Sequence, residues 1–546
     1  MSKSNRKERE NMKKKVIWGT GMYGGRFVKS LDEETIDFFI DQDKKKEGKI
    51  FCGRRIRNPE QINNDEWKEL YLYIPENYYT EISIFLREKG LKESVDFQAY
   101  GHKIYISKKR ADLGEKQYKE KIRKITKIEQ IPIFATYWEK HGYENYFRHI
   151  SDILEKYIVI SERPSQIEGS NDWFKAIDAP LFADYETFID IEDYEIDVKY
   201  NDVDEMFLDE ITQHLQGYFP EKEIKKCRYN AWRQYKYIID TLDILNCKKV
   251  IAFSSVTVGH SILQKICNQR GIEIIYTHPG MIHGTLAFDA IGEVGESVPA
   301  LFAKKFKELP VSKEEVANAV IVREYLKKSR LNRKVQPKKS TFDSIKLHYK
   351  DRPVVFFAGQ NDVGSFMVPY NERAKNYFSP IFSSSIEAAV YLAELCEKNQ
   401  WNFIFKPHPM YVHKEDEKRL PSKAHYIEYA DINDVIDASD VVITILSTTN
   451  YDAIIRDKPV VVLGCMWSKE KGFNYEAFER DEIEKQIKNA LEHGLTNEMK
   501  EMFLKHLAQS LKYYLYDNGE DREIRYGQRF PDSFDGFFDL YNMLKD

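Results

Sequence analysis

Short apolar segments alternate with helical segments along most of the chain, and this alternation limits the fold more than any other feature of the sequence. Residues 353–464 contain the strand-like runs VVFFAG, NFIFK, HYIEY, VVITIL and PVVVLG, with helical segments between them. Strands that are separated by helices pair in parallel, because the crossover helix returns the chain to the same end of the sheet. The sequence therefore predicts an α/β protein built on parallel sheets.

The chain of 546 residues contains several such stretches, and its hydrophobic content of 42% suffices for more than one core. Two consecutive Rossmann-like units are typical of the GT-B layout of glycosyltransferases, in which two lobes enclose a cleft; this analogy of folds does not establish a function. We expect a GT-B-like α/β fold with a small Rossmann-like domain added at the N-terminus. The predicted parts are a basic tail at 1–13, a Rossmann-like accessory domain at 14–105, a helical linker without a core of its own at 106–130, an N-terminal lobe on the acceptor side at 131–345, and a C-terminal lobe on the nucleotide-donor side with a helical return at 346–546.

The charge and the cysteines exclude several classes of protein. The net charge of −5 provides no broad basic field, so we expect no binding to nucleic acid. The six cysteines are scattered without a CxxC pair, which indicates neither a zinc site nor a disulfide framework. No apolar run approaches the roughly 20 residues that span a bilayer, and no signal-type segment follows the basic N-terminal residues. We expect a cytoplasmic protein, with weak attraction of the basic tail to the inner face of the membrane as the alternative.

A glycine-rich turn follows the first predicted strand. Gly19, Gly21 and Gly24 open a helix, and Asp41 ends the next strand, which is the spacing of a dinucleotide-binding turn with its ribose-binding acid. A glycine turn is also needed simply to pack a helix tightly against a sheet, and no hydride-transfer residues follow. We therefore expect an accessory domain that binds no NAD, and we keep the dinucleotide turn as the alternative.

The segment WNFIFKPHPMY, residues 401–411, ends a buried strand with a cation and a histidine held between two prolines. Ligands of open α/β sheets bind beyond the carboxyl ends of the strands, and Lys406 and His408 come just past such an end. Pro407 and Pro409 hold the chain extended, so that the imidazole projects in a set direction. Lys406 and His408 are therefore candidates for binding a phosphate, with a structural histidine that caps a carbonyl as the alternative.

Two further segments follow strands of the same predicted sheet. Ser447, Thr448 and Thr449 end the strand VVITIL and precede a helix, where hydroxyls and free backbone N–H groups can bind an anion. The alternative is plain N-capping by Thr448 or Thr449. A weaker motif, Gln360, Asn361 and Asp362, follows the first strand and is a candidate for contacting a base, a sugar or the cleft.

Residues 276–300, YTHPGMIHGTLAFDAIGEVGESVPA, begin at a strand end of the preceding predicted lobe and concentrate glycines, histidines and acids. Transfer of a glycosyl group requires a residue that takes the acceptor proton or forms a covalent intermediate. We expect this segment to supply that residue from across the cleft. A long glycine-rich surface loop is the alternative.

With these segments together, the chain resembles the capsule polysaccharide synthesis family, whose members include the Kdo transferases of capsule assembly. The resemblance rests on GQNDVGSF at 359–366, FKPHP at 405–409, the block at 432–464, and GMIHGTLAFDAIGEVGESVP at 280–299, and it covers about residues 250–470. It implies GT-B architecture and a CMP-activated donor whose phosphate is held by His408, with the hydroxyls of residues 447–449 beside it. The histidine–proline and Ser/Thr motifs also occur in polysialyltransferases and CDP-polyol phosphotransferases.

The chain departs from that family in one place that concerns catalysis. Several relatives carry an acid before the glycine where this chain reads THPG, and Pro279 replaces it. We therefore expect the catalytic group to come from Asp289, Glu293 or His283, in this order, with Glu296 a further acid of the same loop. Asp289 ranks first because it follows the apolar run TLAF, which can anchor it and preorganise it. The alternative is that Asp289 only caps a turn.

The resemblance implies a glycosyltransferase of capsule or surface polysaccharide synthesis that uses a nucleotide-activated sugar, preferably a CMP-linked one. Its other partners would be a growing glycan or lipid-linked acceptor and proteins of capsule assembly. We expect no metal and no other cofactor, because no Asp-x-Asp motif lies where it would hold a divalent ion. The alternatives are a CDP-polyol phosphotransferase and a nucleotide-binding component of a capsule assembly complex without activity. The sequence does not set the donor sugar, the acceptor, the linkage or its stereochemistry.

Overall fold

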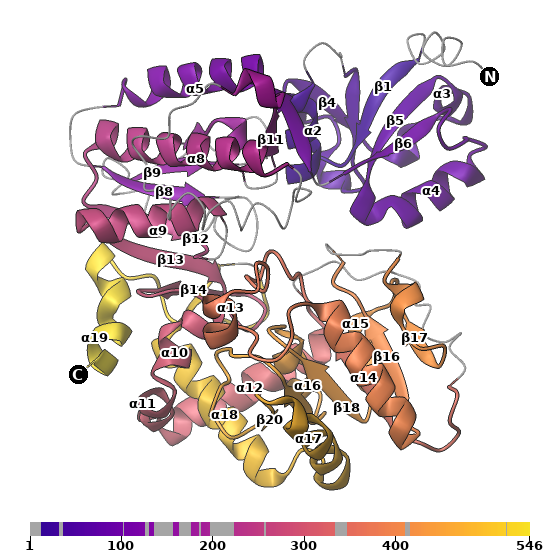
Figure 1. The fold of residues 1–546 in the computed structure, drawn as a ribbon, viewed down its shortest axis with the longest axis vertical. Coiled ribbons are helices and arrows are strands. Elements are labelled where there is room, and N and C mark those ends of the chain that lie inside the picture. The colour runs from indigo at the N-terminus through magenta and orange to yellow at the C-terminus, as the bar shows by residue number, and fades with distance from the viewer. Residues whose placement is uncertain are drawn as a thin grey trace. The chain divides into compact units, whose positions relative to one another are not determined.

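The structure is a computed structural model, and the chain divides into two compact units that are described here one at a time (Figure 1). The first unit comprises residues 1–140, 150–253 and 258–273, and the second comprises 141–149, 254–257 and 274–546. The predicted basic tail lies outside the described residues except for Lys13. The residues that the structure describes are 13–31, 36–101, 103–125, 130–135, 157–162, 176–184, 187–196, 223–255, 258–332, 347–409, 415–519 and 521–545.

The first unit begins with the predicted Rossmann-like domain. Its sheet has the strand order β3-β4-β2-β1-β5-β6, and all neighbours pair in parallel except β3 with β4. Side chains of β1 alternate between two cores, with Val16 and Trp18 on one face of the sheet and Ile17 on the other. The elements are β1 (Lys14–Trp18), α2 (Met22–Ser30), β2 (Phe38–Ile40), β3 (Ile50–Phe51), β4 (Arg54–Arg57), α3 (Asn64–Lys68), β5 (Leu70–Pro75), α4 (Tyr79–Glu88) and β6 (Phe97–Tyr100).

The rest of the first unit is a second α/β layer. Strands β10, β9, β8 and β12 pair in parallel in this order, and a separate parallel pair joins β7 to β11. A fully buried ion pair, 2.8 Å long, joins Arg26 of α2 to Asp184 and so connects the two layers of this unit. The elements are β7 (Ile104–Ser107), α5 (Lys108–Ile122), β8 (Ile131–Ala135), β9 (Tyr157–Ser161), β10 (Ala176–Asp178), β11 (Thr187–Asp190), the 3-10 turn η6 (Asp193–Glu195), α8 (Ile224–Leu245), β12 (Lys249–Phe253) and α9 (Val258–Arg270).

The helix of the predicted linker is part of this packed layer, which corrects the expectation of a linker without a core. Tyr118 and Ile122 of α5 are buried, and the Tyr118 hydroxyl lies 2.8 Å from the hydroxyl of Thr241 in α8. Charged residues dominate α5, and the sequence hides its buried stripe because so few of its positions are apolar.

The second unit contains a six-stranded parallel sheet in the order β17-β16-β15-β18-β19-β20. Both faces are covered, since Val354, Phe356 and Ala358 of β15 belong to one core while Val355 and Phe357 belong to the other. Residues of α12, α15, α16 and α18 fill the first core, and residues of α14 and α17 fill the second (Figure 1). The elements are α12 (Lys313–Ser329), β15 (Val354–Ala358), α13 (Glu372–Tyr377), α14 (Ser385–Asn399), β16 (Asn402–Lys406), β17 (Ala424–Tyr426), α15 (Ile432–Ala438), β18 (Val441–Thr444), α16 (Thr449–Ile455), β19 (Val460–Val462), β20 (Tyr475–Glu476), α17 (Arg480–His493) and α18 (Asn497–Tyr513).

The segment 276–300 belongs to this second unit and not to the lobe that the sequence suggested. Its strand β14 (Thr285–Asp289) pairs antiparallel with β13 (Glu273–Pro279) on one side and with β21 (Leu515–Asp517) on the other. Gly295 lies against the same unit, because a Cβ atom there would be 1.5 Å from the backbone oxygen of Tyr377. The predicted α/β class is confirmed, whereas the predicted division at residue 345 differs from the division at 273 that the contacts show.

Among the described residues, none of the helices combines the length and the hydropathy that crossing a bilayer requires.

Candidate functional site

The strand order of the second unit marks one edge of its sheet as a place for a ligand. In chain order, the strands from β15 to β20 lie in the sequence 3-2-1-4-5-6, so the direction of winding reverses between β15 and β18. Ligands of doubly wound sheets bind at the carboxyl ends of the strands at such a reversal. Ala358 pairs with Lys406 on one side and with Thr444 on the other, so these three strands end at the same edge.

Lys406 ends β16 at this edge, and its side chain has an unusual environment. The residue is 9% exposed, and its Nζ makes no hydrogen bond or ion pair with any residue that the structure describes. Burial lowers the pKa of the amine to about 8, while the carboxylates of Glu428 and Asp431 act in the opposite direction. A buried amine without a partner is costly, whereas a phosphate oxygen in reach would satisfy it.

His408 follows Lys406 by two residues and is half-buried. The backbone there is fixed closely against β15, because the Gly359 amide donates to the Lys406 carbonyl over 2.8 Å. A Cβ atom on Gly359 would lie 3.0 Å from that carbonyl and 3.0 Å from the Cα of Pro407. The structure therefore brings the two predicted phosphate-binding residues to one strand end and holds their backbone rigidly.

Ser447, Thr448 and Thr449 follow β18 and are all half-buried. The Thr449 amide donates to the Ser447 hydroxyl over 3.2 Å, and that hydroxyl in turn donates to the Thr449 hydroxyl over 2.9 Å. Thr448 is the N-cap residue of α16, but its side chain makes no capping hydrogen bond. Capping by Thr448, which the sequence left open as an alternative, is therefore not how this side chain is used. The helix has only seven residues, so the hydroxyls are the stronger argument for an anion site.

The three polar residues after β15 have different surroundings. Asp362 accepts from the Ser385 amide over 2.8 Å and from the Ser385 hydroxyl over 2.5 Å, and burial raises its pKa to about 6. Asn361 accepts from the Gly364 amide over 3.0 Å. Gln360 is half-buried, and its Oε1 has no hydrogen-bond partner among the described residues. Gln360 is thus the member of this motif best able to contact a ligand, while Asn361 and Asp362 shape the loop.

Asp289 ends β14 and is almost completely buried. Its carboxylate accepts from the backbone amides of Ile291 over 2.9 Å, Gly292 over 3.1 Å and Val298 over 2.8 Å. Burial raises its pKa to about 6, and these three hydrogen bonds oppose the rise. These are the contacts of a carboxylate that closes a loop, which is the alternative that the sequence left open; a catalytic role for Asp289 stays a prediction.

Tyr514, at the C-terminal end of α18, connects this carboxylate to a buried histidine. Its hydroxyl lies 3.3 Å from Nε2 of His278, and it also acts on Asp289 by lowering the pKa of that carboxyl. The His278 ring stacks on Trp467 with a centroid distance of 5.6 Å. Sequence reasoning missed Tyr514 because more than 200 residues separate it from the loop, and only the pairing of β14 with β21 brings the two together.

Glu293 is buried against the segment that follows β12. Its carboxylate accepts from the Ser254 hydroxyl and, over 3.3 Å, from the Ser255 amide, while its own amide donates to the Ser255 hydroxyl over 3.1 Å. Ser254 and Val294 have φ angles of +86° and +56°, which L-residues rarely adopt. Strained backbone conformations concentrate at functional sites, where surrounding contacts impose them. Ser254 and Ser255 escaped sequence analysis because serines are common at strand ends.

Glu296 is fixed by Arg373 of α13. Two parallel hydrogen bonds of 2.6 Å join the guanidinium to the carboxylate, and the guanidinium also covers the ring of Phe366 at 4.2 Å. This arrangement neutralises Glu296 and holds the loop against the sheet that carries Lys406.

His283 is placed apart from these acids. It lines a small cavity of about 10 Å³ together with Asn433, Asp452 and Arg456, and no residue of 289–296 lines this cavity. Its carbonyl accepts from the Tyr526 hydroxyl over 2.8 Å. His283 is therefore grouped with α15 and α16, and its catalytic role stays a prediction.

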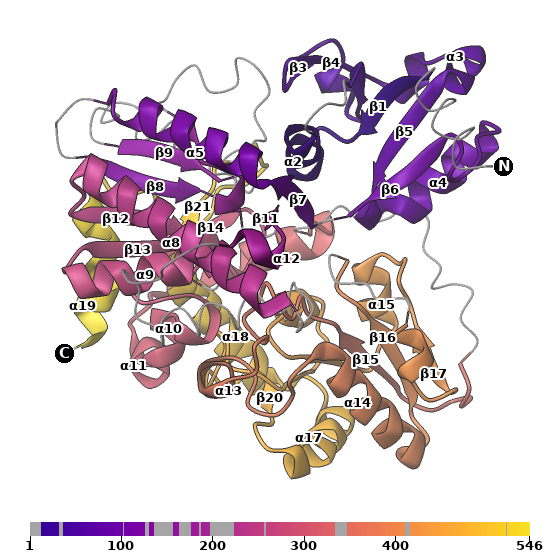
Figure 2. The same ribbon diagram turned by 45° about the horizontal axis from the view of Figure 1, so that its top comes forward.

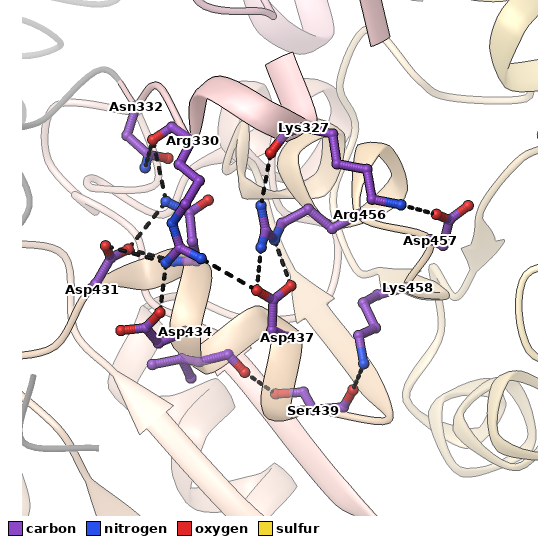
Figure 3. Close-up of polar contacts among 12 residues, drawn as sticks. Lys327, Arg330, Asn332, Asp431, Asp434, Asp437, Ser439, Arg456, Asp457 and Lys458 are labelled. Atoms are coloured by element: carbon purple, nitrogen blue, oxygen red, sulfur yellow. Dashed lines mark hydrogen bonds and ion pairs between the residues drawn. The ribbon is translucent and has the colours of Figure 1, made fainter. Parts of the chain in front are cut away.

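An ion-pair network beside this cavity holds the end of α12 against α15. Figure 3 shows Arg330 among Asp431, Asp434 and Asp437, with Arg456 also directed at Asp437. The shortest of these contacts with printed geometry are 2.5 Å from Arg330 to Asp434 and 2.6 Å from Arg456 to Asp437. Because Asp431 also acts on the pKa of Lys406, the network contributes to the charge around the phosphate candidate.

The glycine turn of the first unit has the backbone that the sequence predicted. Gly19 has a φ angle of +99°, and a Cβ atom on Gly24 would lie 2.1 Å from the Gly19 carbonyl oxygen. Asp41 accepts from the Thr20 amide over 3.1 Å and from Lys46 over 3.0 Å. Burial would raise the pKa of Asp41, but Thr20 and Lys46 lower it overall. The acid is thus already bound within its own domain.

In the part of the chain that the structure describes, histidine, cysteine and acidic side chains form no group of three suited to a metal ion.

Comparison with known proteins gives a family match in the second unit. Residues 373–522 match the family described as CDP-Glycerol:Poly(glycerophosphate) glycerophosphotransferase. No curated protein matches the sequence significantly.

Several solved structures are distantly similar. The beta Kdo 2,7 transferase of Thermosulfurimonas dismutans KpsC has 17% identity and a TM-score of 0.32 over 51% of this chain and 81% of that chain. The beta Kdo 2,4 transferase of the same protein has 12% identity and a TM-score of 0.33 over 47% of this chain and 79% of that chain. The UDP-GlcNAc 2-epimerase of Methanocaldococcus jannaschii has 10% identity and a TM-score of 0.31 over 69% and 98%.

The family match includes Lys406, His408 and residues 447–449, whereas the loop at 276–300 lies outside it. It confirms the predicted resemblance to transferases that build such polymers. The solved structures are too distant to assign a function, so the family match is the basis for the proposal that follows.

Proposed function

Since residues 373–522 form a domain of the CDP-Glycerol:Poly(glycerophosphate) glycerophosphotransferase family, we propose that the protein is a transferase of capsule or surface-polymer synthesis. It takes a nucleotide-activated donor and moves a glycosyl group to a hydroxyl of a growing glycan or lipid-linked acceptor. The donor is a CMP-linked sugar. The observation that carries this proposal is Lys406, a buried cation without a partner among the described residues, at the switch point of a Rossmann-like sheet.

In this proposal the donor phosphate lies between Lys406, His408 and the hydroxyls of residues 447–449. When the bond between the anomeric carbon and the phosphate oxygen breaks, the leaving nucleotide gains negative charge. Lys406 and the hydroxyl donors stabilise that charge, and they are held in place before the reaction begins, which is where electrostatic catalysis gains most. Gln360 contacts the donor from the neighbouring strand end.

The acceptor hydroxyl attacks the anomeric carbon and passes its proton to a carboxylate. We place Glu293 ahead of Asp289 in this role, because the two Asp289 oxygens already accept three backbone hydrogen bonds. Glu293 is bound mainly by two serines at a strained turn, which keeps it positioned. Asp289 then acts by fixing the loop that carries Glu293.

The description of the matched family supports a second candidate, a CDP-polyol phosphotransferase. In that reaction the acceptor oxygen attacks the outer phosphorus of the donor, and the bond between this phosphorus and the CMP oxygen breaks. The same residues would hold the leaving CMP, so the two reactions differ in what is attached to the acceptor.

One experiment separates the candidates. The full chain is incubated with CMP-linked sugars, UDP-linked sugars and CDP-glycerol, each with an acceptor glycan, and the nucleotide released is measured. Release of CMP from a CMP-sugar, with no new phosphodiester in the phosphorus NMR spectrum, supports the glycosyltransferase. A new phosphodiester from CDP-glycerol supports the second candidate. Nucleotide binding without turnover of any donor would contradict both and indicate a binding component.

A further inference from the structure

The first unit contains a cleft that the proposed transfer does not use. Helices α5 and α8 run side by side (Figures 1 and 2), and the cleft between their N-terminal halves has a volume of about 280 Å³. It is lined by Asp112 and Glu115 of α5, by Tyr229, Trp232 and Arg233 of α8, and by Glu195 of η6. The volume is near the lower end of the roughly 300–1,000 Å³ that is typical of small-molecule sites.

The polar groups of this cleft are held in fixed positions. Arg233 has a side chain only 5% exposed, and it donates to Asp112 over 2.8 Å, to Glu115 over 2.6 Å and to the Tyr229 hydroxyl over 2.9 Å. Its Nε is buried and has no hydrogen-bond partner among the described residues. A buried guanidinium that fixes two carboxylates gives the cleft hydrogen-bonding groups that need no rearrangement before binding.

Two aromatic rings supply an apolar surface in the same cleft. Tyr229 and Trp232 are three residues apart on α8, and their ring centroids are 6.1 Å apart with a tilt of 35°. Aromatic rings of this kind offer a large rigid apolar face with a polar edge. An aromatic surface flanked by fixed carboxylates and donors suits a ligand with both C–H faces and hydroxyl groups.

The charges in the cleft exclude the other obvious ligands. Asp112, Glu115 and Glu195 would repel an anionic ligand, and Arg233 and Lys108 would repel a cationic one, while the ion pairs between them leave little net field. A neutral polyhydroxyl compound avoids both penalties and can use donors and acceptors together.

We propose that this cleft binds a neutral saccharide unit. Its assignment to the polymer that the enzyme extends rests on the proposed function, but the binding itself does not. The binding residues come from two helices and a 3-10 turn, and none comes from a strand end, so this site is separate from the phosphate candidate at Lys406.

The test is saturation-transfer NMR on the full chain with methyl glucoside, methyl galactoside and N-acetylglucosamine as neutral probes, and with glucuronic acid and glucosamine as charged ones. We expect saturable binding of at least one neutral probe and weaker binding of both charged probes. Loss of the aromatic surface in Trp232→Ala should weaken the neutral probe about two- to tenfold, the effect of roughly 0.5–1.5 kcal/mol for an aromatic contact. Trp232→Phe, which preserves an aromatic ring, should lose less.

Leu113→Ala is the matched control, because Leu113 lies on α5 next to Asp112 but is 47% exposed and does not line the cleft. Thermal unfolding verifies that each variant is folded. The proposal is overturned if no neutral probe binds the wild type, if a charged probe binds best, or if Trp232→Phe and Glu195→Gln both bind as the wild type does. Nucleotide binding is measured on the same samples: its loss in Lys406→Met with saccharide binding intact, or the reverse in Trp232→Ala, shows which of the two proposals fails.

Discussion

A lysine that is buried without a partner lowers the stability of a fold, so the position of Lys406 requires an explanation beyond packing. It lies where three parallel strands end together, beside His408 and close to the hydroxyls that follow β18. A nearby phosphate would both satisfy the amine and restore its charge. Each residue of this group therefore has a measurable effect on nucleotide binding.

The pH dependence of binding tests Lys406. Its pKa is lowered from 10.5 to about 8 in the folded protein. The charged amine is therefore present below pH 8 and is lost as the pH rises through this value, while a nucleotide phosphate remains ionised throughout. We expect the affinity for CMP, measured by calorimetry, to fall between pH 7 and pH 9 in the wild type. Lys406→Met should bind more weakly at pH 7 and show no such fall; an equal pH dependence in both proteins would contradict the assignment.

His408 is tested by removing its ring. A hydrogen bond to a charged phosphate contributes roughly 1.5–3 kcal/mol, so His408→Ala should weaken nucleotide binding about ten- to a hundredfold and abolish transfer. His425→Ala is a suitable control, because His425 lies on the same sheet in β17. Unchanged nucleotide affinity in a folded His408→Ala protein would rule out the role.

At the scale of elements, the loop after β14 is fixed by its own aspartate and by the C-terminal return. Asp289 closes the loop, Tyr514 contacts both Asp289 and His278, and Arg373 fixes Glu296. Two of these partners come from distant segments, so the loop depends on contacts between elements more than on its own sequence. A carboxylate that closes the loop and one that takes a proton should respond differently to substitution.

Asp289→Asn and Glu293→Gln make this distinction. Asp289→Asn replaces an acceptor oxygen with an amide group, and an unsatisfied buried group costs about 1–3 kcal/mol, so both the midpoint of thermal unfolding and turnover should fall. Glu293→Gln should lower turnover by about a hundredfold or more, as expected for loss of a general base, with little change in stability. The order is reversed if Asp289→Asn is as stable as the wild type but inactive and Glu293→Gln remains active.

Tyr514→Phe tests the connection to the C-terminal return. The substitution removes a hydroxyl that is buried between His278 and Asp289, so we expect a loss of about 1–3 kcal/mol and faster hydrogen exchange in residues 280–298. The neighbouring Tyr513→Phe is the control, since its hydroxyl is exposed and donates only to the Pro310 carbonyl. Equal exchange in the loop of both variants would show that Tyr514 does not hold it.

At the scale of the whole molecule, the sequence predicted the regular parts better than the connections. Alternating strands and helices predict the parallel sheets, and the residues after β15, β16 and β18 were expected at one edge because parallel strands share their carboxyl ends. The membership of the loop at 276–300 in the second unit was not predicted, because it depends on long-range contacts such as Arg373 with Glu296. Neither was the isolation of the Lys406 amine, since a sequence does not show which charges lack a partner.

The N-terminal domain provides the last test, because its glycine turn is formed as in dinucleotide-binding proteins while its acid is occupied. Both oxygens of Asp41 accept hydrogen bonds, Oδ2 from Thr20 and Lys46 and Oδ1 from the Asp43 amide over 2.9 Å. A ribose would have to displace these donors, so we expect no binding of NAD or NADH at millimolar concentration. Trp18 lies next to Gly19 and serves as a fluorescent reporter for the titration. Free Trp in the same buffer corrects for absorption by NADH, and adenosine monophosphate tests for binding of the nucleotide half alone. A saturable change in the wild type that disappears in Gly24→Val would show that the turn does bind a dinucleotide.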